Sequence, residues 1–414
     1  MAGGGGGDGC GDRWVDLSLD LFSLIFSKLS LPQLLRSAAV CVSWSAAAHE
    51  VRTRSRRFEF RGQGPWLMFG GGPDRDSSAA TFYTLDEGRE YTIPLPDAPI
   101  SRRFLLGSAH GWVITYDTSL GLFQLLNPIT GSQIDLPSVV SNHLDIIHDN
   151  DERSNIRTRR QFPLTESLIE TPPFKAILSA DPSLEDDYTV VFIHYFIPSI
   201  CFTRSGYDSW FQLNDVNQFQ DILFHKGKLY ATTISGSVQV CVIDDARLRR
   251  GELPTFTPVT PPDPDHCHFD YLAETPRGDL LNIQRKLGRH DPTVFVEVYR
   301  LQLEEEILSR RTEQVKDLGE LIIFLGDNHP LCLSASDFPH LRPNSIYFTD
   351  ELTLFNRHRR SMRIEEQSIS GESQSCLPFP VDVGIYSMTD HTFTSILPGD
   401  PRLKWPPPVW FKLD

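Results

Sequence analysis

Apolar residues recur with helical spacing in the N-terminal part of the chain. The first predicted helix begins near Leu19, and its apolar side chains share one face: Leu21, Leu24, Ile25 and Leu29. A second helix is expected from Leu31-Pro32, because proline is tolerated in a first helical turn. A third helix is indicated by the spacing of its apolar residues: Trp44, Ala47, Ala48 and Val51.

This helical module carries more leucine than a small core can bury. A unit of about 40 residues cannot remove enough apolar surface from water by itself. The surplus side chains must therefore meet another surface, either a partner protein or the rest of this chain. We interpret the module, residues 13–51, as a docking element.

After Arg61 the pattern changes to short alternating runs separated by turn residues. Three segments predict antiparallel hairpins with a glycine in the turn: Phe104–Asp117, Asp221–Thr233 and Tyr271–Gln284. Five more runs are typical of strands: Phe123–Gly131, Val238–Asp244, Thr293–Leu301, Leu321–Asp327 and Ser345–Asp350. The longest apolar run, Thr189–Phe202, predicts two paired buried strands.

The predicted fold is mainly β: a three-helix N-terminal module followed by a β-propeller of about six to seven blades. The roughly 350 residues after Arg61 far exceed one sandwich, and a four-stranded blade takes about 45–50 residues. A closed ring also shields the edges of its sheets. We expect a tail at 1–12, the helical module at 13–51, a basic linker at 52–61 and the propeller at 62–414.

Two polar stretches, 142–163 and 356–375, exceed the usual connection between strands, so we expect them to be disordered or functional. Residues 303–311 carry the one helical pattern in the β-rich part. The arginines between positions 52 and 61 favour a solvated linker over a nucleic-acid site, because runs of charge are usually solvated.

Composition removes several classes of function. The chain has 414 residues and a net charge of −15, which argues against a nucleic-acid partner. The run Thr189–Phe202 is too short to span a bilayer, so we expect no membrane partner. Seven cysteines form no CxxC pair, and a glycine run replaces a secretory signal, which together indicate a reducing compartment.

The segment Pro261–Asp270 is the strongest metal candidate, because it gathers Asp263, Asp265, His266, Cys267, His268 and Asp270. No second pair of ligands follows at zinc spacing, so we expect an acidic, proline-rich loop entering a blade, with no metal and no cofactor.

Catalysis has little support in the sequence, which contains no nucleophile elbow, P-loop or dinucleotide fingerprint. The five tryptophans of the β-rich part are expected to wedge blades together rather than to form a carbohydrate platform: Trp66, Trp112, Trp210, Trp405 and Trp410.

The helical module resembles an F-box. The residues that carry the resemblance occur in the family's order: Trp14, Leu17, Asp20, Leu21, Ile25, Leu31-Pro32, Leu34, Arg36 and the run Val40-Cys41-Val42-Ser43-Trp44. Two positions depart from the family pattern. Ser18 stands where a proline is usual, and Val42 stands where a basic residue is common. The serine is expected to loosen the start of the first helix.

The β-rich part resembles the KIB-type β-propeller of a large group of plant F-box proteins. The resemblance covers nearly the whole chain in order and spacing, and six segments carry it: Gly107–Asp117, Leu125–Pro137, Phe224–Val240, Tyr271–Arg285, Pro343–Glu351 and Trp405–Phe411. It points to the fold and the family and leaves the substrate open.

The resemblance implies a non-catalytic adaptor, the substrate-recognition subunit of a Skp–cullin–F-box ubiquitin ligase. The F-box would dock on a Skp-type adaptor, and through it on cullin, while the propeller binds an unknown protein substrate. Carried over residue by residue, adaptor contact falls on Leu17, Leu21, Ile25, Leu29, Leu31, Val40, Cys41 and Trp44. The expected location is the cytoplasm, the nucleus or both.

Two alternatives stay open from the sequence. The first is a propeller enzyme with a helical N-terminal cap, which predicts a cluster of metal ligands or carboxylates in the central channel. The second is a propeller scaffold that no longer binds the adaptor, which the departures at Ser18 and Val42 suggest.

Overall fold

The computed structural model describes residues 17–54, 64–70, 79–95, 100, 103–117, 119–139, 173–194, 199–214, 218–250, 252, 254–287, 293–303, 312–349, 383–403 and 408–412. The expected tail at 1–12, the stretches 142–163 and 356–375, and the helical pattern beyond 303 lie outside these residues.

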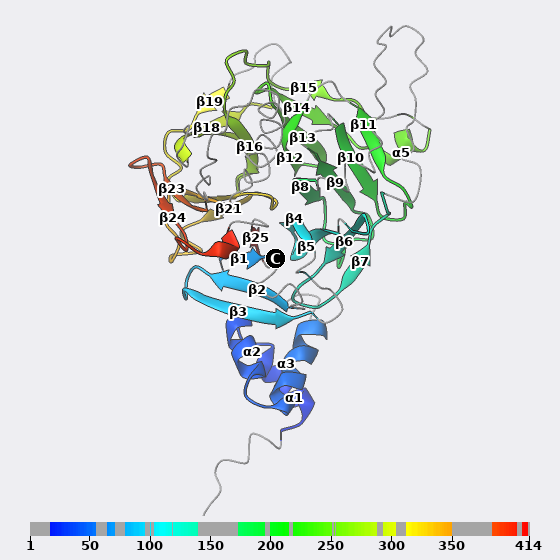
Figure 1. Cartoon of the computed structure of the whole chain (residues 1–414), viewed down its shortest axis with the longest axis vertical. Helices are drawn as coiled ribbons and strands as arrows, with labels where there is room; N and C mark the ends of the chain where they lie inside the picture. Colours follow the sequence, from blue (N-terminus) through cyan, green and yellow to red (C-terminus); the bar gives the residue numbers. More distant parts are fainter. Residues whose placement is uncertain are drawn as a thin grey trace, which may run out of the picture.

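The three predicted helices are present and form a module beside the ring (Figure 1): α1 (Leu19–Phe26), α2 (Leu31–Ala38) and α3 (Val42–Arg54). A capping box starts α2, where Ser30 and Gln33 each bind the other's backbone amide through a side-chain oxygen. Because α3 continues to Arg54, the first residues of the expected linker are helical.

Six sheets form a closed ring, which confirms a mainly β propeller and sets the number of blades at six (Figure 1). Blade 1 comprises β25 (Val409–Phe411), β1 (Trp66–Phe69), β2 (Ala79–Thr84) and β3 (Arg89–Pro94). Blade 2 comprises β4 (Phe104–Ala109), β5 (Trp112–Asp117), β6 (Leu122–Leu126) and β7 (Gln133–Asp135). Blade 3 comprises β8 (Lys175–Leu178), β9 (Thr189–Ile193), β10 (Ser199–Arg204) and β11 (Phe211–Asn214).

The second half of the ring follows the same plan. Blade 4 comprises β12 (Phe219–His225), β13 (Lys228–Thr233), β14 (Val238–Cys241) and β15 (Thr257–Pro258), with the short helix α5 (Asp245–Leu248) before β15. Blade 5 comprises β16 (Phe269–Glu274), β17 (Leu280–Leu287), β18 (Thr293–Leu301) and β19 (Thr312–Gln314). Blade 6 comprises β21 (Leu331–Ser334), β20 (Leu321–Leu325), β22 (Ser345–Phe348), β23 (Gly384–Ser387) and β24 (Thr392–Ser395), and the 3₁₀ turn η2 (Pro401–Leu403) follows it.

The predicted hairpins are confirmed in register. In the first, β4 pairs antiparallel with β5, and the turn residues His110 and Gly111 both have positive φ values, 53° and 72°. Two consecutive residues with positive φ define the turn that matches the twist of paired strands, and glycine adopts this conformation without strain. The apolar run at 189–202 forms the antiparallel pair β9 and β10, as predicted.

Blade 6 departs from the simple meander. Its strand β20 pairs antiparallel with β21 but parallel with β22, which gives a five-stranded sheet. The additional strand and the long connections use up residues that would otherwise build a seventh blade. For this reason length alone left the choice between six and seven blades open.

The ring closes in blade 1 through the pairing of the first and the last strand of the chain. β25 pairs antiparallel with β1, with Trp66 opposite Phe411 and Met68 opposite Val409. The side chain of Ser108 in β4 donates a hydrogen bond to the carbonyl of Trp410 in β25, which joins blade 1 to blade 2.

Aromatic residues fill the spaces between the blades, as expected for the tryptophans of this part. Trp66, Trp112, Trp210 and Trp410 are all buried. Trp210 packs against Phe123 and Phe192 at ring distances of 4.9 Å each, which joins blades 2 and 3. Trp405 lies outside the described residues.

A buried ion pair crosses the centre of the ring. Lys175, at the start of β8, places its Nζ 2.5 Å from a carboxylate oxygen of Asp221 in β12, and the two side chains are only 3% and 0% exposed. Lys175 also donates a hydrogen bond to the carbonyl of Gly326, after β20, at 3.0 Å. Asp221 accepts a hydrogen bond of 2.7 Å from the backbone N–H of Leu272 in β16. The pair therefore connects blades 3, 4, 5 and 6.

The replacement Lys175→Met tests this connection. It leaves the Asp221 carboxylate buried without its counter-charge, which typically costs about 3–5 kcal/mol. We expect the free energy of unfolding, measured by denaturant titration, to fall by about this amount.

The exposed pair of Arg250 and Glu252 offers a matched control, since Arg250→Met should leave the unfolding midpoint nearly unchanged. The double variant Lys175→Met with Asp221→Asn should regain most of the lost stability. A single variant Lys175→Met as stable as the control would show that the pair does not hold the ring together.

Candidate functional site

The helical module has its own small core. Phe22, Phe26, Leu34, Ala47, Ala48 and Val51 are buried within it. Trp44 packs on the rings of Phe22 and Phe26 at 5.7 and 5.5 Å, which attaches the N-terminal part of α3 to α1. Leu17 and Leu29 are half-buried against the same core. Three of the predicted contact residues, Leu17, Leu29 and Trp44, thus contribute to the stability of the module itself.

A second set of apolar side chains on the module faces solvent. On α1 the exposed residues are Leu21, Leu24 and Ile25, and around the start of α3 they are Val40 and Val42. Their exposed fractions run from 43% for Ile25 to 87% for Val42. Cys41 lies among them and is also exposed. We call these six residues the apolar surface of the module.

The six residues of the apolar surface are exposed, so the ring does not cover them. Figure 1 shows α1 farthest from the propeller, whereas α2 contacts β3 of blade 1. Solvent-exposed clusters of large apolar side chains are uncommon on a protein that functions alone, and they mark interaction surfaces. Leu24 and Val42 belong to this surface, although the motif did not assign a contact to them; their exposure is the signal that identifies them.

Leu31 lies on the opposite side of the module. It is completely buried in a cluster with Trp66, Met68, Val409 and Phe411 of blade 1. Leu35 packs against the same cluster. An adaptor contact through Leu31 would therefore require α2 to leave blade 1, whereas the apolar surface is accessible as the molecule stands.

Polar contacts complete the junction between α2 and blade 1. The guanidinium of Arg36 lies 3.2 Å from the carboxylate of Glu87, in the turn between β2 and β3. The hydroxyl of Tyr91 in β3 donates a hydrogen bond to the same carboxylate. These groups are partly exposed, so the apolar contact of Leu31 supplies most of the binding energy at this junction.

The departure from the family pattern at Ser18 does not prevent α1 from starting there. Ser18 is the N-cap residue, and its carbonyl accepts hydrogen bonds from the N–H groups of Leu21 and Phe22 at 3.0 and 3.1 Å. Its side chain makes no capping hydrogen bond. The helix therefore begins at the predicted place with backbone contacts only.

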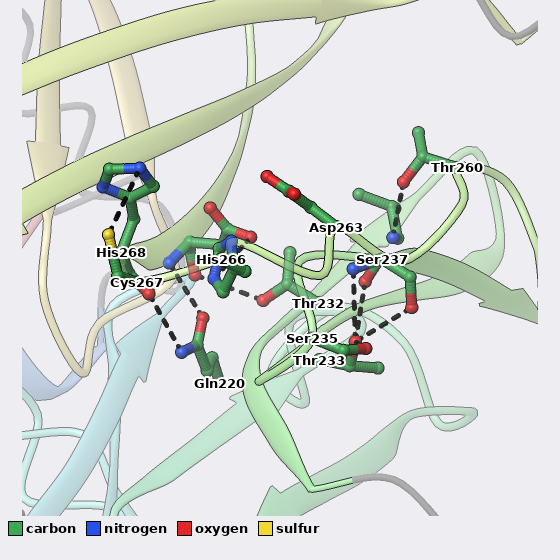
Figure 2. A network of polar contacts seen from close by, with 12 residues as sticks. Gln220, Thr232, Thr233, Ser235, Ser237, Thr260, Asp263, His266, Cys267 and His268 are labelled. Carbon is green, nitrogen blue, oxygen red and sulfur yellow. Dashed lines mark hydrogen bonds and ion pairs between the residues drawn. The ribbon is translucent and has the colours of Figure 1, made fainter.

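The former metal candidate, residues 261–270, forms a loop that leads into β16, as the sequence predicted. Figure 2 shows this loop beside strands of blade 4. The side-chain amide of Gln220 holds it at two points, by donating to the carbonyl of His268 at 3.2 Å and accepting from the N–H of Asp270 at 3.0 Å. Within the described segments, no group of three or more His, Cys, Asp or Glu side chains is arranged to hold a metal ion.

Burial strongly affects the acidic groups near this loop. It raises the pKa of Asp270 to about 8, and the neighbouring Asp221 contributes to the rise. Burial also raises the pKa of Asp221, although Lys175 and two backbone amides oppose that shift.

No helix in the described part of the chain is long and apolar enough to cross a membrane.

A propeller with a three-helix module on the rim of blade 1 defines the structural class. The chain belongs to the KIB1-4 beta-propeller family, whose model matches residues 82–387.

Relatives in Arabidopsis thaliana extend over most of the chain. The F-box protein At2g05970 is 25% identical over 363 residues, which are 81% of this chain and 84% of the relative. The F-box/kelch-repeat protein At1g57790 is 26% identical over 350 residues, which are 83% and 85% of the two chains. These matches confirm the expected plant F-box protein with a KIB-type propeller.

Among solved structures, virginiamycin B lyase from Staphylococcus aureus overlaps with a TM-score of 0.33 and 11% identity, covering 62% of this chain and 70% of that chain. An overlap of this size carries no argument about function.

Two leucine substitutions separate the two sides of the module. Leu31→Ala should lower the free energy of unfolding by about 2–5 kcal/mol, because it opens a cavity in a fully buried cluster. Leu24→Ala should change it by less than about 0.5 kcal/mol, because Leu24 is 63% exposed. Thermal denaturation of the full chain measures both effects, and equal losses for the two variants would contradict the assignment of sides.

Proposed function

We propose that this protein is the substrate-recognition subunit of a Skp–cullin–F-box ubiquitin ligase. The module binds a Skp-type adaptor, which connects it to cullin, and the propeller binds a protein substrate. The observation that carries the proposal is the apolar surface on α1 and the start of α3, which remains exposed while the rest of the module is buried against itself and blade 1.

The physical chemistry of this surface suits a lasting protein contact. Five large aliphatic side chains point into solvent, and covering them releases water from a substantial apolar area. We narrow the adaptor contact to Leu21, Leu24, Ile25, Val40, Cys41 and Val42. Leu17, Leu29 and Trp44 support these residues from the core of the module, and Leu31 belongs to the junction with blade 1.

The mechanism is proximity. The adaptor side and the substrate side are parts of one folded unit, since α2 is packed on the ring. A bound substrate lysine is thereby kept near the activated ubiquitin at a high effective concentration. The chain itself then needs no catalytic group. We propose that it acts in the cytoplasm, the nucleus or both.

The burial of the ion pair between Lys175 and Asp221 favours a non-catalytic role over the role of a propeller enzyme. Lys175 and Asp221 neutralise each other, are only 3% and 0% exposed, and spend their remaining hydrogen bonds on backbone groups. Groups that react with a substrate have to be accessible to it. This pair has the burial of a structural element.

Adaptor binding is tested with the full chain and a purified Skp-type adaptor. The variant Leu21→Asp with Ile25→Asp places two charges in the apolar surface without touching the module core. We expect affinity to fall at least about 30-fold, the equivalent of about 2 kcal/mol, as for central residues of an interface. Calorimetry or surface plasmon resonance measures the change.

The matched control is Leu184→Asp, which introduces the same charge at a leucine that is 54% exposed on blade 3. It should bind like the unaltered chain. If the unaltered chain binds no adaptor while its helices are folded, the protein is an adaptor-independent scaffold and the proposal fails. If the double variant binds as well as the control, the contact residues are wrong.

A further inference from the structure

His266 and Asp270 form a buried pair that the proposed function does not use. The Nε2 atom of His266 lies 3.5 Å from a carboxyl oxygen of Asp270, and the side chains are 3% and 0% exposed. Neither imidazole nitrogen and neither carboxyl oxygen makes a hydrogen bond of good geometry within the described residues. The contact of 3.5 Å therefore places the imidazole beside a carboxyl group with which it can exchange a proton.

The pair joins two consecutive elements of the chain, since His266 and Asp270 are four residues apart. Asp270 belongs to β16, whereas His266 belongs to the segment 259–268 that crosses from β15 to β16. This segment is also fastened by backbone contacts, as Asp263 donates its N–H to the carbonyl of Ser235 at 2.8 Å (Figure 2). At this pair, the side chain of His266 from the segment contacts Asp270 of strand β16 in the ring.

The side chain of His266 is almost completely covered by its surroundings. Its ring rests on Gly236 in the turn between β13 and β14, where a Cβ atom would come within 2.6 Å of Nδ1. A charge in such a place loses its hydration, so both the imidazolium and the carboxylate are disfavoured.

The elements around Asp270 contribute groups that affect whether its carboxyl is protonated. Strand β12 brings the carboxylate of Asp221 with its partner Lys175, and β17 brings the amide of Gln284. Strand β13 brings the hydroxyl of Thr232, which donates to the carbonyl of Asp270 at 3.1 Å. The segment itself brings His268 and Asp263. A negative charge on Asp221 opposes a second one on Asp270.

We propose that the segment 259–268 is a proton-linked latch, held against blades 4 and 5 by one proton shared between Asp270 and His266. Loss of that proton places an unpaired carboxylate beside Asp221 in the closed state, and the segment opens to return the charge to water. Opening uncovers the seam between the two blades, which makes this surface available in a pH-dependent way.

The pH window follows from the two groups together. Burial raises the pKa of Asp270 to about 8 and lowers the pKa of His266 below its ordinary 6.5. Between about pH 4 and 6.5 the open segment carries one proton, on the imidazole. The closed segment also carries one proton, shared by the pair, so the opening equilibrium does not depend on pH in this range. Between about pH 6.5 and 8 only the closed segment keeps its proton. The equilibrium constant for opening then increases about tenfold per pH unit, and it becomes constant above about pH 8.

Amide hydrogen exchange of the full chain measures this equilibrium. Exchange from an open state is itself base-catalysed, which contributes about tenfold per pH unit for every amide. For the N–H groups of Asp263, His266 and Asp270 we expect about a hundredfold increase per unit between pH 6.5 and 8, and about tenfold above pH 8. The N–H of Gly278, bonded to Thr275 at the far end of β16, is the internal control and should follow the tenfold slope throughout.

Two variants separate the roles of the partners. Asp270→Asn keeps the shape of the protonated carboxyl and should remove the additional slope entirely. His266→Gln removes the imidazole that takes up the proton in the open segment, so the hundredfold slope should begin near pH 4 instead of 6.5. A tenfold slope in the unaltered chain, or an additional slope that survives in Asp270→Asn, would overturn the latch.

Discussion

Closure of the ring in blade 1 is the constraint on which the rest of the structure depends. The innermost strand of that blade, β25, follows all the others in sequence, and it pairs with β1. The cluster that it completes contains Val409 and Phe411 from β25, Trp66 and Met68 from β1, and Leu31 from the helical module. The same apolar contacts therefore close the propeller and hold the F-box in place.

The centre of the ring obeys a second constraint, which concerns charge. Six sheets form the ring, and polar groups that are buried between them have to be satisfied by one another. The ion pair of Lys175 with Asp221 meets this requirement by using backbone groups of neighbouring blades as additional partners. Burial, together with the neighbouring Asp221, raises the pKa of the Asp270 carboxyl to about 8.

Local patterns predicted much of this fold from the sequence. The three helices, the hairpin turn at His110-Gly111 and the buried pair of strands in 189–202 follow from spacing and from glycine chemistry, which act over a few residues. The number of blades did not follow, because the parallel pairing of β20 with β22 joins strands that no short-range pattern connects.

The candidate site was predictable only in part for a related reason. Helical periodicity shows which side chains are apolar, but it does not say which of two surfaces will cover them. Leu21 and Leu31 look alike in the sequence, yet one is exposed and the other is completely buried against blade 1. The charge cluster was hidden for the same reason, since Lys175, Asp221 and Asp270 come from three different blades.

The position of β25 has a consequence for the order in which the protein matures during synthesis. The ribosome makes α1, α2 and α3 first, but the surface on which Leu31 rests is finished only when Val409 and Phe411 have been added. Until then the helices are tethered to an incomplete ring. A chain that stops before β25 would keep every residue of the apolar surface, yet it would lack part of the contact that fixes the helices in one orientation.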